Sequence, residues 1–471
     1  MLDEGFLPDI PPQVQTEVHQ LSEERVIAEE TVHDLRQLLW SSIDNKTSRD
    51  LDQVEFVEQQ PGGTIRVMVG IADVDAFVTK GSSIDSYALE NTTSVYTGVA
   101  TFPMLPEELS TDKTSLLQDD DRLAIIIEFD VASDGTVTTQ DIFRALVHNY
   151  SKMSYEIVGN WLDGNAAVPD EVSRVPKLEA QVRMQFDAAQ RLRKARRAQG
   201  ALRLQTIQAT PVIDNLGEIV DLAVDEENGA RDLIESFMVA ANGAMAEFLE
   251  RKGVTSLRRV VRTPDNWPRI VEIAQELHDT LPNEPDVRAL SDFLERQRKA
   301  DPDHFADLSL AVVKLLGPGD YVVQRPGEEA DGHFGLAVQR YTHSTAPNRR
   351  YADLVTQRLL KGSINGKGSQ YSLDELKRIA EHCNDRESAA RKVERKMRKV
   401  AAAILMKDRV GDEFNAIVTG VAAKGTFARI IKPPVDGMVV RGERDLRVGQ
   451  QIRVKLLSTD PDRGFIDFAA T

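Results

Sequence analysis

Alternating apolar and polar residues predict strands in the first third of the chain. Residues 64–79 alternate in this way, and a strand pair is expected at 123–131 and 136–145, joined by a Ser133-Asp134-Gly135 turn. Apolar residues spaced by three or four positions predict long helices farther on. These helices are expected at 177–199, 231–251, 268–280, 351–361 and 373–406.

The two ends of the chain follow other patterns. Residues 1–40 are acidic, and residues 12–40 are predicted to be helical, with Ser22 as an N-cap and room for a helix-turn-helix. From Gly411 onward, five short β-patterned runs separated by glycines predict a small five-stranded barrel over 409–471. We therefore expect an α+β protein with a helical segment at 1–40, a large domain at 41–408 and a terminal barrel.

Composition limits the classes of protein that remain. The chain has 471 residues, of which 41% are hydrophobic and 28% charged, which is typical of a folded protein of two or three domains. Cys383 is the only cysteine, so an intramolecular disulfide and a thiolate metal cage are excluded. The first residues lack the basic and apolar regions of an export signal, and no apolar run approaches the roughly 20 residues of a membrane span. We expect a cytoplasmic protein without membrane association.

The formal net charge of −17 argues at first against nucleic-acid binding. The charge is uneven, however, because residues 1–60 hold 14 acids against 4 bases, a balance of −10. Residues 183–203 carry 7 bases against 1 acid, and residues 386–409 carry 9 bases against 3 acids, so each stretch is +6. Such stretches indicate either nucleic-acid contact or a solvated helix face.

Three aspartates form the most suggestive cluster. Asp44, Asp50 and Asp52 lie within nine residues. On a helix they would point to about 0°, 240° and 80°, so only a loop lets them converge. Converging carboxylates need a cation or protons, and hard oxygen ligands favour Mg²⁺ or Mn²⁺. If no other motif accompanied the cluster, the simpler interpretation would be a polar surface loop.

Two further residues have side chains suited to a phosphate site. Tyr96 precedes a proline-bounded turn, and Arg349 precedes a helix in YTHSTAPNRRYADL. A tyrosine ring can stack on a base, and an arginine can stabilise charge on a transferring phosphoryl group. The alternatives are a core aromatic residue and an arginine exposed at a helix start.

Taken together, these motifs resemble the ribonuclease II (RNB) family of 3′→5′ exoribonucleases. The likeness runs from about residue 42 to residue 407 and continues into the barrel, and its motifs stand in the family's order. They are Asp44, Asp50 and Asp52; Ile71–Val74; Tyr96–Pro106; the segment LVHNYSKMSYEIVGNWL with Tyr155; GALRL at 200–204; Glu235–Asn242; HFGLAVQRYTHSTAPNRRYADL; and Val393-Glu394-Arg395.

The resemblance implies a catalytic domain with a mixed sheet surrounded by helices, followed by an S1-type OB barrel. It implies an Mg²⁺ centre at Asp44, Asp50, Asp52 and Gln53, with Mn²⁺ as a substitute, and catalysis by Asp50, Asp52 and Arg349. RNA contacts are implied for Tyr96, Tyr155, Glu235, Glu394, Arg350 and position 204, and on the barrel for Phe414, Phe427, Arg429 and Lys432. We expect a monomer that processively degrades single-stranded RNA to nucleoside 5′-monophosphates.

Three features depart from the family pattern. Gln53 replaces the second aspartate of a pair, so the metal site loses one negative charge. Leu204 stands where an aromatic residue would stack on the terminal bases. Only about 40 residues precede the aspartates, too few for two N-terminal cold-shock barrels. The alternative is therefore an RNA-binding relative with impaired catalysis; a DNA nuclease is the weaker third choice, because Tyr155 and Glu235 would read the ribose.

Overall fold

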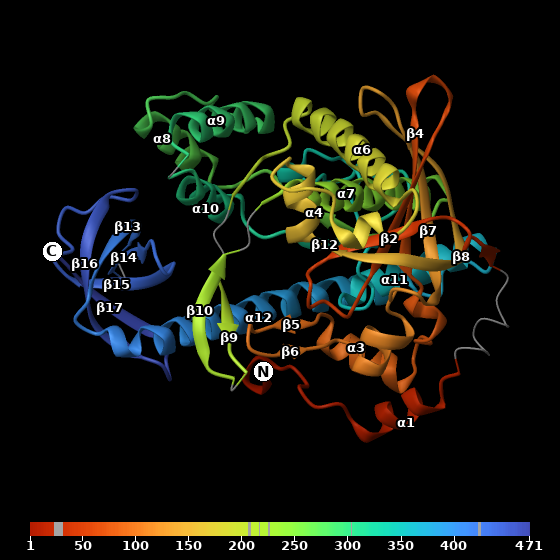
Figure 1. The fold of residues 1–471 in the computed structure, drawn as a ribbon, viewed down its shortest axis with the longest axis horizontal. Helices are drawn as coiled ribbons and strands as arrows, with labels where there is room; N and C mark the ends of the chain where they lie inside the picture. Colours follow the sequence, from red (N-terminus) through yellow and green to blue (C-terminus); the bar gives the residue numbers. More distant parts are fainter. Residues whose placement is uncertain (23–31, 206–208, 216, 225–226, 303, 423–424) are drawn as a thin grey trace.

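A computed structural model describes the chain except for residues 23–31, 206–208, 216, 225–226, 303 and 423–424. A large α/β body and a small β-barrel lie at opposite ends of the molecule (Figure 1). Helix α12 (Leu373–Met406) runs from one to the other. Ser372 begins this helix with a capping box to Glu375, as its sequence favours.

A curled sheet forms the centre of the large body. Its strand order is β1-β8-β2-β3-β4-β7, and β8 also pairs with β7, so the sheet closes on itself. The strand β8 pairs in parallel with β1 and β2, whereas the other neighbours are antiparallel. The bounds are β1 His33–Asp34, β2 Trp40–Asp44, β3 Gln53–Gln59, β4 Ile65–Ala72, β7 Asp121–Val131 and β8 Val137–Ser154.

Helices cover both faces of this sheet because its strands are apolar on both sides. On one face, Val57, Val69 and Ile127 pack against α6 (Leu178–Ala198) and α7 (Gly229–Arg251). On the other, Val54 and Ile126 belong to a cluster that includes α3 (Ser83–Asn91), α11 (Tyr351–Ile364) and α12. The end of β2 and the start of β3 therefore lie within a rigid, covered framework.

Smaller elements complete the large body. A fully buried guanidinium, that of Arg358 on α11, pairs with Asp75 and Asp85 at 2.9 and 2.8 Å and fixes α11 against the sheet. The remaining helices are α1 Pro12–Gln20, α4 Tyr155–Leu162, α5 Asp170–Ser173, α8 Trp267–Glu276, α9 Val287–Ala300 and α10 Phe305–Leu316. The two-stranded pairs are β5 Val95–Tyr96 with β6 Thr101–Phe102, β9 Ala209–Ile213 with β10 Ile219–Val224, and β11 Ser256–Val260 with β12 Asp320–Gln324. Short 3₁₀ helices lie at Leu2–Glu4, Pro61–Gly63, Val74–Ala76, Phe334–Leu336 and Lys407–Arg409, and a short π-helix lies at Leu109–Lys113.

The C-terminal barrel is closed in the order β13-β14-β15-β17-β16, as the short β-patterned runs predicted. Its core includes Phe468, Val454 and Ile430, and Met406 of α12 packs into the same cluster. The strands are β13 Glu413–Ala422, β14 Gly425–Ile430, β15 Val435–Arg441, β16 Gln451–Asp460 and β17 Phe465–Ala470. The α+β architecture is thus confirmed.

The N-terminal expectation needs correction. We predicted that residues 12–40 are helical. Among the described residues of this range, the helix is α1, and it ends at Gln20. His33–Asp34 and Trp40 lie in strands, because they pair with β8 and join the central sheet. The second helix of a helix-turn-helix would fall on residues 23–31, outside the described residues, as would most of the turn that Ser22 was expected to cap. Among the described residues, no helix is long and apolar enough to span a bilayer.

Candidate active site and RNA cleft

The three aspartates lie on the connection from β2 to β3, as the loop interpretation required. Asp44 ends β2, and Asp52 directly precedes β3. The buried hydroxyl of Ser115 holds the segment between them: it accepts from the Leu51 amide at 2.9 Å and donates to the Arg49 carbonyl at 2.6 Å. Lys152 of β8 donates to the carbonyls of Lys46 and Ser48. The loop is therefore fixed through its backbone.

Asp44 is paired with the glutamine that departs from the family pattern. Gln53 Nε2 donates to Asp44 Oδ1 at 3.3 Å, while the buried Asp44 Oδ2 has no hydrogen-bond partner among the described residues. Burial raises the pKa of Asp44 to about 6, with the Gln53 hydrogen bond acting in the opposite direction. A carboxylate oxygen in this state is well placed to accept a cation.

Asp52 is the more deeply buried carboxylate, with an exposed fraction of 4%. The Asn348 backbone amide donates to Asp52 Oδ1 at 3.1 Å, and Arg349 Nε lies 3.6 Å from Asp52 Oδ2. Burial raises the pKa of Asp52 to about 7, and the Arg349 charge opposes that rise. The segment before α11 thus brings Arg349 to the aspartates across nearly 300 residues of sequence.

Tyr96 connects the aspartates to α12. Its phenol donates to Asp50 Oδ2 at 3.2 Å, and its backbone amide donates to Glu394 Oε1 at 3.1 Å. Burial raises the pKa of the Tyr96 phenol, which keeps the group protonated as a donor. The residue remains 41% exposed, so it is accessible to a substrate. Glu394 therefore positions Tyr96 in this structure.

Tyr155 and Glu235 lie on a second wall of the site. Tyr155 begins α4, and the Arg231 guanidinium of α7 lies 4.8 Å from its ring centroid. Arg231 Nη2 also donates to Asn45 Oδ1 at 3.3 Å, beside Asp44. Glu235, one helical turn from Arg231, has its Oε1 3.6 Å from Arg196 Nη1. These contacts connect α6, α7 and the aspartate loop.

The donor set fits a hard divalent cation. Among the described residues, no three His, Cys, Asp or Glu side chains form a ready-made metal cage. Mg²⁺ does not require one, because it commonly binds one or two carboxylates and completes its octahedron with water and substrate phosphates. The unpartnered Asp44 Oδ2 and the buried Asp52 provide such carboxylates.

Two predicted RNA-binding residues are engaged elsewhere. Arg350 Nε and Nη2 donate to the fully buried Asp353 at 2.8 and 2.7 Å, so Arg350 holds the first turn of α11. Leu204 packs against the apolar cluster of α8, α9 and α10. A nucleotide contact remains a prediction for both residues.

Sequence reasoning did not find Asn348, Ser115, Lys152 and Arg231. Asn348 contacts Asp52 through its own backbone amide, and the Ser115 side chain contacts backbone groups of the loop. No side-chain pattern in the sequence indicates contacts of these kinds. Lys152 and Arg231 come from β8 and α7, far along the chain from the loop that they contact. The Pro347-Asn348-Arg349 order was the available signal for Asn348, since it adjoins the arginine singled out.

Two cavities lie along α12. The first, of about 240 Å³, is bounded by Tyr96, Arg349, His343 and Tyr321, with Arg391 and Glu394 on its α12 side. The second, of about 470 Å³, lies between α12, α10, β10 and the barrel. Arg391 of the first and Arg395 of the second are four residues apart on α12, so neighbouring positions on one face of the helix border the two cavities.

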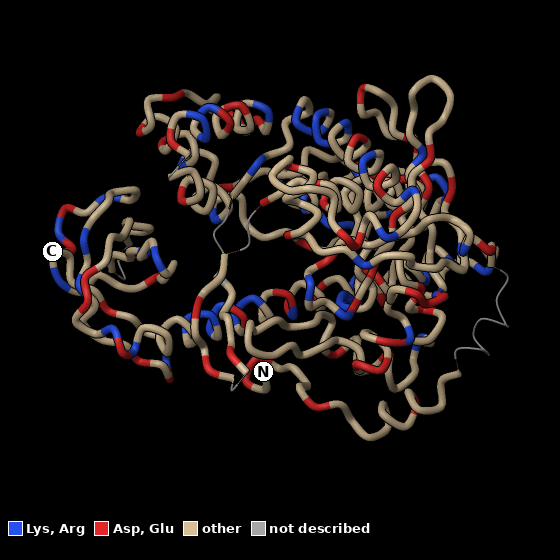
Figure 2. Tube along the Cα trace, viewed as in Figure 1, with Lys and Arg blue, Asp and Glu red and all other residues tan. Residues whose placement is uncertain are grey.

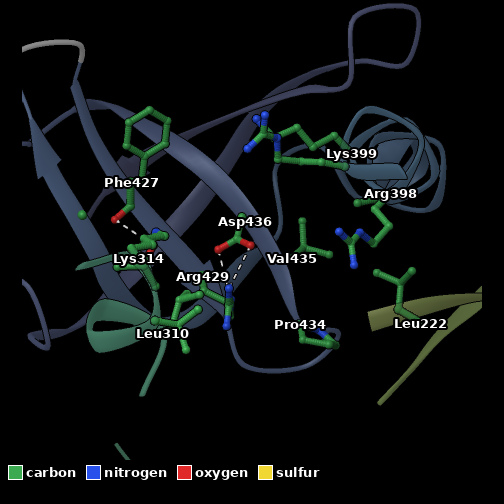
Figure 3. Close-up of a pocket in the computed structure, with 15 residues that line it drawn as sticks. Leu222, Leu310, Lys314, Arg398, Lys399, Phe427, Arg429, Pro434, Val435 and Asp436 are labelled. Carbon is green, nitrogen blue, oxygen red and sulfur yellow. Dashed lines mark hydrogen bonds and ion pairs between the residues drawn. The ribbon is translucent and has the colours of Figure 1, made fainter. Parts of the chain in front are cut away.

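The second cavity has a strongly basic wall. Figure 3 shows Lys314, Arg398, Lys399 and Arg429 around it, with Asp436 paired to Arg429 Nε at 3.0 Å. Arg395 also lines it, so five bases face one acid. Phe427 is 37% exposed on the barrel side, whereas Phe414 is buried in the barrel core. Phe427 and Arg429 thus line the cavity, where an RNA contact stays a prediction, and Phe414 is a core residue.

The two basic stretches have different surroundings. On α6, most of the bases have acidic partners; the pairs are Arg183–Glu179, Arg191–Asp187, Arg193–Asp232, Arg196–Glu235 and, just beyond α6, Arg203–Glu227. On α12, acidic partners are also present, in the pairs Arg386–Glu90, Arg391–Glu387 and Lys392–Glu4. Farther along α12, where the helix approaches the barrel (Figure 2), Arg395 and Lys399 line the second cavity. The solvated-face interpretation suits α6, and the nucleic-acid interpretation suits only this part of α12.

The fold and this site together define a class of protein. Residues 32–366 match the RNB domain, and residues 412–471 match the RNase II-type exonuclease C-terminal S1 domain. Because the first match alone covers more than half of the chain, the chain belongs to the RNB family.

Ribonuclease R of Thermotoga maritima is 30% identical over 473 residues, which cover 92% of this chain and 64% of that protein. The chain thus spans slightly less than two thirds of that relative.

Two solved structures with the same fold are described in different ways, one as a ribonuclease and the other as a pseudonuclease. Mycoplasma genitalium RNase R in complex with ribose methylated single-stranded RNA matches with a TM-score of 0.90 at 23% identity, over 100% of this chain and 77% of that chain. Yeast Ssd1, described as a pseudonuclease, matches with a TM-score of 0.66 at 17% identity, over 88% of this chain and 51% of that one. The fold is therefore shared by proteins with different catalytic descriptions.

Proposed function

We propose that this chain is an Mg²⁺-dependent hydrolytic exoribonuclease that degrades single-stranded RNA from its 3′ end to nucleoside 5′-monophosphates. The observation that carries the proposal is the buried Asp52 carboxylate, which faces Arg349 and lies on a loop that also presents Asp44 and Asp50. A relative named Ribonuclease R supports the reaction class.

Each of these residues has a distinct task in the proposed reaction. Arg349 is 44% exposed on its side chain, so its guanidinium can bind the scissile phosphate and stabilise the charge that develops on it. Tyr96 presents a half-exposed ring on which the 3′-terminal base stacks, and its hydrogen bond to Asp50 keeps the ring beside the aspartates. Asp52 accepts a proton from the attacking water.

Asp44, Asp52 and the carbonyl of Gln53 are the residues that would hold Mg²⁺. When bound, Mg²⁺ lowers the pKa of water and offsets the negative charge of the phosphodiester. Mn²⁺ has the same preference for oxygen ligands and is expected to substitute. The Gln53 amide keeps Asp44 oriented toward this position.

The proposed selectivity for RNA depends on the wall that contains Tyr155 and Glu235. The proposed processivity depends on the basic cavity at the barrel. Tyr155 and Glu235, which contact Arg231 of α7 and Arg196 of α6 respectively, are the residues proposed to read the ribose 2′-hydroxyl. The basic cavity at the barrel would hold the RNA upstream while the 3′ end occupies the aspartate site. RNA held at two places along α12 stays bound between cleavage events. We expect the protein to act as a cytoplasmic monomer.

The alternative is an RNA-binding relative with impaired catalysis. Gln53 and Leu204 favour it, and a pseudonuclease shares the fold. The joint presence of Asp44, Asp50, Asp52, Tyr96 and Arg349 favours the enzyme, because a decayed site should lose several of these residues.

The proposal is tested with 5′-labelled single-stranded RNA and the DNA of the same sequence. With Mg²⁺, the RNA is expected to shorten stepwise from its 3′ end, while excess EDTA stops the reaction and the DNA persists. RNA that binds but keeps its full length with Mg²⁺ would favour the impaired relative. Equal shortening of both strands would favour the DNA nuclease.

A further inference from the structure

The first seven residues of the chain lie beside β5 and α12 (Figure 1), although they precede the part that matches the RNB domain. Phe6 is the buried residue of this segment, with an exposed fraction of 1%. It belongs to a small apolar cluster with Val95 of β5 and with Ala390 and Val393 of α12. The proposed reaction uses none of these four residues.

Two residues of this cluster directly precede residues of the candidate active site. Val95 precedes Tyr96, and Val393 precedes Glu394. The Tyr96 backbone amide donates to Glu394 Oε1 at 3.1 Å, which joins β5 to α12. Val95 is fully buried whereas Tyr96 is 41% exposed, because consecutive residues of a strand point to opposite sides. Phe6 therefore packs on the buried side of the junction whose outer side carries Tyr96.

Polar contacts hold Phe6 from both directions along the chain. The Arg386 guanidinium of α12 donates to the Glu4 carbonyl at 3.1 Å and lies 5.5 Å from the Phe6 ring centroid. The Leu7 amide donates to Asn91 Oδ1 at 2.9 Å, and Asn91 Nδ2 donates to the Leu7 carbonyl at 3.2 Å. Sliding Phe6 along α12 would break these hydrogen bonds, so its position is fixed.

The segment that carries Tyr96 is also joined to Arg349. The Ser94 amide donates to the Arg349 backbone carbonyl at 3.0 Å, two residues before Tyr96. On its other side, the same segment contacts the Phe6 cluster through Val95. Loss of the contacts on one side would therefore change how Tyr96 is placed relative to Arg349.

We propose that Phe6 positions Tyr96 and so determines how tightly the 3′-terminal nucleotide of RNA is held. Phe6 itself is buried and acts through Val95 and Tyr96. Removal of its ring leaves a cavity between β5 and α12, into which the junction of Tyr96 with Glu394 can shift. Phe6 has this task only if Tyr96 stacks on the terminal base, as in the proposed function.

Stacking of the terminal base, measured without cleavage, tests the role of Phe6. The full chain with excess EDTA is titrated against a short single-stranded RNA that ends in the fluorescent base 2-aminopurine, whose emission changes when it stacks. We expect F6A to weaken the affinity at least about fivefold, the lower end of the effect of one stacked base. F6L keeps most of the apolar volume and should restore nearly the wild-type affinity. Wild-type affinity and emission in F6A would overturn the inference.

A double substitution separates positioning from general loss of stability. In a Y96A background, F6A should have no further effect on affinity, because the residue through which Phe6 acts is absent. V14A is the matched control: Val14 of α1 is also 1% exposed but packs in the cluster of the central sheet, so V14A should leave affinity unchanged. Equal effects of F6A with and without Tyr96, or an equal loss in V14A, would overturn the inference. If thermal unfolding shows that F6A has lost its fold, F6V supplies the result.

The proposed function fails in a distinguishable way. If the wild type stacks the terminal base, F6A weakens that stacking through Tyr96 and the RNA stays intact with Mg²⁺, Phe6 keeps its role and the exoribonuclease proposal fails. If the wild type shortens RNA while F6A binds the 3′ end normally, the exoribonuclease proposal stands and Phe6 has no such role. A wild type that leaves the terminal base unstacked overturns the inference as well.

Discussion

At the scale of single residues, two consecutive arginines have opposite environments. The Arg349 side chain is 44% exposed beside Asp52, whereas Nε and Nη2 of Arg350 both donate to the buried Asp353. Arg349 is therefore available to a substrate phosphate, and Arg350 stabilises the start of α11.

Alanine at each position should separate these roles. We expect R349A to lower kcat by at least about 10²-fold, the usual effect of losing one stabilising group, and to lower the free energy of unfolding by less than R350A does, because the exposed Arg349 lies 3.6 Å from Asp52. R350A leaves the buried Asp353 without its cationic partner, with the Ala346 amide still donating to Oδ1, and should lower the free energy of unfolding by about 3–5 kcal/mol. Steady-state kinetics and urea unfolding measure the two quantities. Equal loss of stability in both variants would contradict the distinction.

The same scale shows why the sequence predicted only part of the site. Asp44, Asp50, Asp52, Tyr96 and Arg349 carry their chemistry in their side chains, and the structure brings them together. Asn348 serves Asp52 through a backbone amide, which any residue could offer.

At the scale of elements, the aspartate loop is attached to other segments through its backbone, by the Ser115 hydroxyl and by Lys152 of β8. Ser115 is fully buried and bonds to the backbone on both sides of Asp50. The alternation and glycine punctuation of the sequence predicted β4, β7, β8 and the barrel, because those strands repeat a local pattern. The attachment of the loop could not be predicted, since it joins residues 64 positions apart.

Removing this hydroxyl should loosen the loop. S115A leaves the buried Leu51 amide without its acceptor, which we expect to cost about 1–3 kcal/mol in the free energy of unfolding and to lower kcat. Urea unfolding and initial rates provide the measurements. S86A removes an exposed hydroxyl on α3 and serves as the control, with a change within about 0.5 kcal/mol. An S115A variant that behaves like S86A would show that the loop needs no such support.

At the scale of the whole molecule, a net charge of −17 coexists with a basic cavity. Five bases and one acid line the space between α12 and the barrel, while the bases of α6 are largely paired with acids. Net charge describes the outer surface as a sum, whereas an RNA strand responds to the charges along its own path.

The salt dependence of RNA binding should therefore show whether the basic residues of the cavity contact RNA phosphates. We expect affinity for single-stranded RNA to fall with salt, and the double variant R395A/K399A to reduce the slope of log affinity against log salt by about 1.4, or 0.7 for each lost phosphate contact. Filter binding over a range of salt concentrations gives this slope. R183A/R191A, on the paired face of α6, is the control and should leave it unchanged. Equal slopes in the wild type and R395A/K399A would exclude the cavity as an RNA path.

The release of the 3′-terminal nucleotide tests most directly the proposal that this chain is a hydrolytic exoribonuclease that depends on Asp52. RNA labelled in its last internucleotide phosphate is incubated with Mg²⁺ and either the wild type or D52N, at RNA concentrations where both bind. The wild type should release the label as a nucleoside 5′-monophosphate, and D52N, which keeps the shape of Asp52 without its charge, should release it at least about 10³-fold more slowly. Label released equally fast by D52N, or released in a product other than a 5′-mononucleotide, would contradict the account.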